Sequence, residues 1–130
     1  MQIIRKVIPI LPFLAAALFV MGPLLLPGFV LTMDMVFTPA LRAPDHVDNT
    51  YLFYGALHIF NSVVPADALQ KILLVSALTL SGWGMYRLLL ILRYDSSRSW
   101  HLAAYCAGLF YAVNPFVYDR LMAGQYGVLL

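Results

Sequence analysis

A single carboxylate, Asp34, lies where a long apolar run ends, and it is the residue best suited to chemistry. No charged residue occurs from Val7 through Met33, so Asp34 is the first acid after this run. A carboxylate among apolar neighbours is expensive to desolvate, and the reasons to keep one there are chemistry, ion binding or a buried partner. Asp34 is therefore the first candidate for a catalytic or ion-binding residue.

Four other polar residues are candidates for substrate binding. The guanidinium of Arg120 is well suited to bind phosphate oxygens. The alternative is that Arg120 and Asp119 both anchor a helix end at the membrane interface. Asp119 and Arg120 are adjacent and point in different directions on a helix, so they need not pair. Gln125 can bind a sugar hydroxyl or join two helices. His58 either contacts substrate or hydrogen-bonds water.

One acidic pair in the sequence has the ligand chemistry for a metal ion. Asp45 and Asp48 flank His46, and hard cations favour carboxylate oxygens. An Asp-x-x-Asp pattern after proline is also typical of a turn and helix cap. A divalent cation is therefore a candidate cofactor, but we assign no metal ligands and no other cofactor.

The composition predicts an integral membrane protein. The chain is 62% hydrophobic and 11% charged, whereas soluble domains carry roughly 25% charged residues. The net charge is only +2 and the sequence has no run of basic residues, so nucleic acid is not an expected partner. The one cysteine, Cys106, excludes an intrachain disulfide. The first expected partner is therefore the lipid bilayer.

Hydropathy predicts an all-α, polytopic fold with spans at about 7–31, 68–92 and 100–113. The first is too long for the 7–15-residue core of a signal peptide and long enough to cross about 30 Å of hydrocarbon. Asn114-Pro115 interrupts the third span, because the residue before proline avoids the helical region. Segment 114–130 then begins a fourth helix. We expect residues 1–130 to form a single incomplete transmembrane domain of a larger protein.

The first loop, 32–67, is expected to contain a helix at about 51–64. Polar and small residues recur there at helical spacing: Tyr51, Tyr54, Gly55, His58 and Ser62. About 14 residues are too few to cross a bilayer, so this helix is expected to lie in the membrane interface, or alternatively to dip into the membrane. Asn49-Thr50 is a candidate cap at its start and Pro65 a candidate terminator.

The distribution of charge predicts the orientation of the chain. Arg5 and Lys6 precede the first span, and Arg93 and Arg98 lie between the second and third. By the positive-inside rule these segments face the cytoplasm, in a multi-pass protein of the cell membrane. The loop 32–67 and the segment 114–125 then share the extracytoplasmic side, where several loops can assemble one site.

Small residues predict places where neighbouring helices pack closely. Ala104, Gly108 and Ala112 are spaced four apart, so they share one face of a helix. Gly82-Trp83-Gly84 offers a second place where a neighbouring helix can approach closely. We interpret both patterns as packing features, not as binding motifs.

The chain resembles the start of the GT-C class of polytopic glycosyltransferases. A short cytoplasmic tail, one span and an acid just beyond its outer end, Asp34, carry the first part of this resemblance. The string Asn-Pro-Phe-Val-Tyr-Asp-Arg-Leu-Met-Ala-Gly-Gln-Tyr-Gly (114–127) looks like a segment of uncharacterised bacterial and archaeal members, distantly similar to arabinofuranosyltransferases. Helices that lie along the membrane in the first outer loop are a further shared feature.

The resemblance implies transfer of a sugar from a polyprenyl-phosphate donor to a glycan or lipid acceptor outside the cytoplasm. Asp34 matches the general base of such enzymes. Because Met33 and Met35 flank it, the paired acids that some members carry are missing, which puts metal binding by the loop in doubt. We expect residues 1–130 alone to be inactive. The alternatives are a transporter or flippase subunit, with Asp34 and Asp119 on an ion or substrate path, and a structural membrane scaffold.

Overall fold

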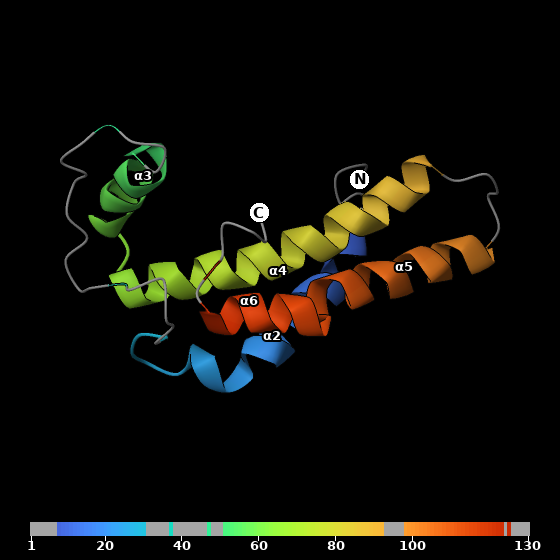
Figure 1. The fold of residues 1–130 in the computed structure, drawn as a ribbon, viewed down its shortest axis with the longest axis horizontal. Helices are drawn as coiled ribbons and strands as arrows, with labels where there is room; N and C mark the ends of the chain where they lie inside the picture. Colours follow the sequence, from blue (N-terminus) through green and yellow to red (C-terminus); the bar gives the residue numbers. More distant parts are fainter. Residues whose placement is uncertain are drawn as a thin grey trace.

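The computed structural model describes residues 8–30, 37, 47, 51–92, 98–123 and 125, and its regular structure over these residues is entirely helical. In chain order, the elements are η1 (Ile8–Ile10), α2 (Leu11–Met21), η2 (Gly22–Leu25), α3 (Tyr51–Asn61), α4 (Ala66–Ile91), α5 (Arg98–Val113) and α6 (Pro115–Ala123). The all-α class predicted from the sequence is confirmed for this part of the chain (Figure 1).

The first helical stretch is shorter than predicted because prolines and glycines limit it. Pro12 is accepted in the first turn of α2, where its missing N–H has no intrahelical partner. At Gly22 and Pro23 the α-helix tightens into the 3-10 turn η2, which ends at Leu25. Gly28 then adopts a φ of +115°, which an L side chain rarely adopts. Helical structure thus ends six positions before the predicted boundary at residue 31.

The other long helices agree with their predicted boundaries within two residues. α4 spans Ala66–Ile91 and α5 spans Arg98–Val113, against predictions of 68–92 and 100–113. Two stretches of the described chain, Ile8–Leu25 and Ala66–Ile91, are long and apolar enough to cross a membrane. With 16 residues α5 reaches about 24 Å, which is short of that length.

The Asn114-Pro115 break separates α5 from α6, as predicted. The Asn114 side chain accepts a hydrogen bond from the Val117 N–H at 3.1 Å and donates one to the Tyr111 carbonyl at 2.9 Å. Asn114 is therefore the N-cap of α6, and Pro115 occupies the first helical position. The Tyr118 N–H also donates to the Asn114 carbonyl, at 3.1 Å, so Asn114 links the end of α5 to the first turn of α6.

Three helices meet in an antiparallel arrangement around Phe13. This fully buried ring of α2 lies 5.8 Å from the ring centroids of Tyr86 in α4 and Tyr105 in α5. The two tyrosine rings stack on each other at 4.3 Å. Gly82 and Gly108 let the backbones of α4 and α5 approach beside them, which confirms the packing role predicted from the small residues. Figure 1 shows α4 running beside α5 over most of its length.

A second buried cluster joins α6 to α2 and the first half of α4. It consists of Ala17, Met21, Leu74, Leu78, Val117 and Leu121. Leu25 and Val30, just beyond α2, pack against the same cluster. The exit of the first helical stretch and the segment after Asn114 therefore lie at one end of the bundle.

Helix α3 lies off the beginning of α4, away from the three-helix bundle (Figure 1). Leu57 is its one buried residue, in contact with a small cluster that includes Phe37 and Leu69. The helix begins at Tyr51 as predicted but ends at Asn61, because the chain turns at once: the Ser62 hydroxyl donates to the Ile59 carbonyl at 2.6 Å. Pro65 lies beyond this turn and precedes α4.

Candidate functional site

The candidate base lies outside the described residues, and so do Asp45, His46 and Asp48. What the structure does define is the stretch of chain that leads toward Asp34, from Leu26 to Val30. This stretch follows the last turn of η2 and has no regular secondary structure of its own. Its backbone groups therefore need partners from elsewhere in the protein.

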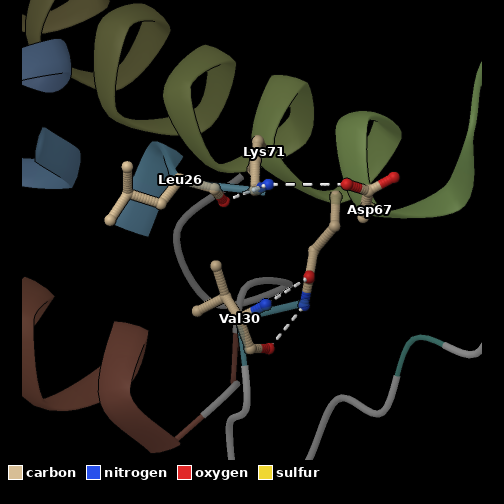
Figure 2. A network of polar contacts seen from close by, with 5 residues as sticks. Leu26, Val30, Asp67 and Lys71 are labelled. Atoms are coloured by element: carbon tan, nitrogen blue, oxygen red, sulfur yellow. Dashed lines mark hydrogen bonds and ion pairs between the residues drawn. The ribbon is translucent and has the colours of Figure 1, made fainter. Parts of the chain in front are cut away.

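Gln70 of α4 supplies two of those partners. Its side-chain carbonyl accepts a hydrogen bond from the Val30 N–H at 2.9 Å, and its amide donates one to the Val30 carbonyl at 2.8 Å. The side chain is only 1% exposed. A buried amide with both ends satisfied by one residue's backbone holds that residue in a defined position (Figure 2).

The next residue of α4, Lys71, holds the other end of the same stretch. Its ammonium donates a 2.6 Å hydrogen bond to the Leu26 carbonyl and lies 3.6 Å from the Asp67 carboxylate (Figure 2). Lys71 is thus a buried, compensated charge, because it has both an acid and a carbonyl as partners.

Neither Gln70 nor Lys71 is among the candidate residues inferred from the sequence. In the structure the Lys71 side chain turns back onto the chain that leaves η2. A usable signal was present: Asp67, Gln70 and Lys71 recur at helical spacing in the first turns of an otherwise apolar helix.

On α6, Arg120 is held between a ring and an amide. Its guanidinium carbon lies 5.0 Å from the ring centroid of Phe116, and its Nη1 donates a short hydrogen bond to the Gln125 side-chain carbonyl. The Gln125 N–H in turn donates to the Arg120 carbonyl at 2.9 Å. The structure therefore brings together two of the predicted substrate-binding residues, with the arginine partly exposed.

The other two predicted binding residues lie on two different helices. Asp119 is exposed on α6, beside Arg120 in the sequence. His58 is exposed on α3, which adjoins the start of α4 rather than α6. The described structure does not gather all four candidates at one point.

The hydrophobic cluster links the network on α4 with α6. Val30, which Gln70 holds, packs against the cluster that contains Leu121, the neighbour of Arg120. The chain toward Asp34 and the segment that carries Arg120 are thus fixed to the same group of apolar side chains.

Within the described residues, no three His, Cys, Asp or Glu side chains are grouped as metal ligands. Comparisons with family models, with curated proteins and with solved structures find no match to this chain.

Proposed function

We propose that this chain is the N-terminal part of a membrane glycosyltransferase that uses a polyprenyl-phosphate sugar donor. The observation that carries the proposal is the common packing of Val30 and Leu121 on one cluster. In this proposal Asp34, which follows the held residue Val30 by four positions, supplies the base at the end of the bundle where the partly exposed guanidinium of Arg120 lies.

At the anomeric carbon of the donor sugar, the proposed reaction forms one bond and breaks one. The acceptor hydroxyl attacks the anomeric carbon of the donor sugar, and the bond from that carbon to the phosphate oxygen breaks. Asp34 takes the hydroxyl proton as general base. Arg120, with its planar fork held by Gln125 and Phe116, stabilises the charge on the departing lipid phosphate.

A membrane setting is supported by the side chains that the bundle leaves uncovered. Phe19 of α2 is 86% exposed, and Leu102 and Phe110 of α5 are 65% and 71% exposed. Large apolar side chains on the outside of two neighbouring helices favour lipid, or further transmembrane helices, as their surroundings. We propose α5 as a third span, completed by the turn at Asn114 and by α6.

The proposed topology places α3 in the outer interface. Its exposed apolar side chains are Leu52, Phe53, Ile59 and Phe60, and Val63 follows in the next turn. His58 and the tyrosines of the same helix suit the headgroup region. The N-terminus and residues 93–98 then face the cytoplasm, and Asp34 faces outward.

The test is transfer of sugar by the whole protein in membranes, with radiolabelled polyprenyl-phosphate sugars and the variants Asp34→Asn and Asp95→Asn. Asparagine keeps the shape of aspartate and removes the base, and Asp95 lies in the link that the proposal assigns to the cytoplasmic side. The proposal predicts transfer by the wild type and by Asp95→Asn, and a loss of about 100-fold or more in Asp34→Asn at equal insertion. Equal transfer by all three would exclude Asp34 as the base. No transfer by the wild type from any donor would favour the transporter alternative.

A further inference from the structure

Gln70 makes an unusual connection for a residue of an apolar helix. Its two hydrogen bonds both go to the backbone of one residue 40 positions earlier. A leucine at this position would fill a similar volume and bury no polar atoms, so packing alone does not explain a glutamine. The amide matches the one N–H donor and the one carbonyl acceptor of the Val30 backbone.

The backbone of Val30 has a specific need for this partner. The preceding helical turn ended at Leu25, so the Val30 N–H and carbonyl lie outside any helical ladder. The amide of Gln70 occupies the place of a neighbouring backbone strand and satisfies both groups. Lys71 likewise donates a hydrogen bond to the carbonyl of Leu26, which precedes Val30 by four residues. Together the two side chains fix the direction in which the chain leaves the first helix.

We propose that Gln70 is a positioning residue: by holding the backbone of Val30, it sets the point from which the chain carries Asp34 into the site. The role for catalysis rests on the proposed function, whereas the hold on the backbone does not. Gln70 touches neither donor nor acceptor in this proposal and acts only through Val30.

Two substitutions separate the hydrogen bonds from the volume of the side chain. Gln70→Leu keeps most of the volume and removes both bonds. Gln70→Glu keeps the shape of the side chain. When the introduced carboxyl is protonated, it offers one donor and one acceptor, as glutamine does. When it is ionised, it offers acceptors only, and one of its oxygens then faces the Val30 carbonyl without a donor between them. Thr79→Val is the matched control, because Thr79 is a buried polar residue of the same helix whose hydroxyl donates within that helix, to the Val75 carbonyl.

The first readout is hydrogen exchange of the Val30 amide in the whole protein, measured by mass spectrometry on peptides that cover residues 26–31. We expect about tenfold faster exchange in Gln70→Leu and no change in Thr79→Val. For Gln70→Glu, we expect exchange at the wild-type rate below the pH at which the introduced carboxyl titrates, and fast exchange above it. The charged groups near Gln70 are Asp67 and Lys71, which form an ion pair. The exchange rate of the wild type, measured at each pH, corrects for any effect of their titration.

The second readout is the rate of sugar transfer. A positioning role predicts that Gln70→Leu lowers kcat about tenfold with little change in donor KM, and that Gln70→Glu regains kcat at low pH relative to wild type. A role in stability alone would lower the amount of folded protein and leave kcat per folded molecule, and its pH profile, unchanged.

The outcomes distinguish this inference from the proposed function. Fast exchange at Val30 in Gln70→Leu, with pH-dependent rescue in Gln70→Glu, supports the hold on the backbone even where the wild type transfers no sugar. Unchanged exchange in both variants overturns it, whatever the transfer assay gives. Fast exchange with unchanged kcat in an active enzyme overturns the positioning role.

Discussion

Gly82 of α4 and Gly108 of α5 are in direct backbone contact. A Cβ added to Gly108 would lie 2.6 Å from the Gly82 carbonyl oxygen, and one added to Gly82 would lie 3.0 Å from the Gly108 carbonyl oxygen. The ring of Phe13 closes the third side, 2.7 Å from the same added atom on Gly108. Neither backbone can yield without separating the helices, so this contact fixes the distance between α4 and α5.

We therefore expect Gly108→Ala to destabilise the protein by about 1–3 kcal/mol, the cost of overpacking a well-filled contact. The control is Gly84→Ala on α4, where an added Cβ meets nothing within 4 Å. There the higher helix propensity of alanine should leave stability unchanged or raise it by up to about 1 kcal/mol. Thermal unfolding in detergent compares the two, and equal midpoints would contradict the close contact.

Phe13 gives a second prediction for the same junction. Because its ring is fully buried against Tyr86 and Tyr105, Phe13→Ala should leave a cavity and cost about 3–5 kcal/mol. Phe19→Ala is the control on the same helix, since that ring is 86% exposed and leaves no internal cavity. We expect a large fall in the unfolding midpoint for the first and a small one for the second. A similar fall for both would mean that Phe13 is not at a packed junction.

The helices of this chain could be predicted from the sequence to a large extent. Proline and glycine limit where helices begin and end, and the Asn114-Pro115 pair predicted the break between α5 and α6. The small residues around Gly108 predicted the close helix contact because only a residue without a side chain permits it. Each of these inferences depends on local backbone sterics, which a single sequence expresses directly.

The polar network could not be predicted in the same way. Gln70 and Val30 are 40 positions apart, and their pairing depends on where the chain turns after η2. Lys71 at the end of an apolar helix is typical of a side chain that reaches the headgroups, and only the fold shows that a free carbonyl lies nearer. The pairing of Arg120 with Gln125 likewise follows from the turn after α6. Long-range partners of polar groups require the tertiary arrangement.

The cap of α6 gives a third prediction. Asn114→Ala removes the acceptor for the Val117 N–H and should cost about 1 kcal/mol, whereas Asn114→Asp retains an acceptor and should cost less. Hydrogen exchange at Val117 measures the effect locally. Because Val117 belongs to the buried cluster, we also expect faster exchange of its α6 neighbours in the alanine variant. Identical exchange in the two variants would contradict the capping role.

Arg120 gives the last prediction, which concerns binding and rests on the proposed function. Arg120→Lys keeps the positive charge but loses the planar fork, the contact with Phe116 and the geometry of the bond to Gln125. If this guanidinium binds the lipid phosphate, donor KM should rise about tenfold, equivalent to about 1.4 kcal/mol of binding.

The matched control is Arg87→Lys on α4, whose guanidinium carbon lies 5.9 Å from the ring centroid of Trp83, near the junction around Phe13 and Tyr86. It tests the loss of an arginine–aromatic contact at the opposite end of the bundle, and donor KM should stay at the wild-type value. Initial rates over a range of donor concentrations separate KM from kcat for both variants. A rise in KM shared by both variants would mean that arginine–aromatic contacts support the fold in general. An unchanged KM in Arg120→Lys would remove Arg120 from the donor site, because a phosphate held by the planar fork of arginine discriminates against lysine.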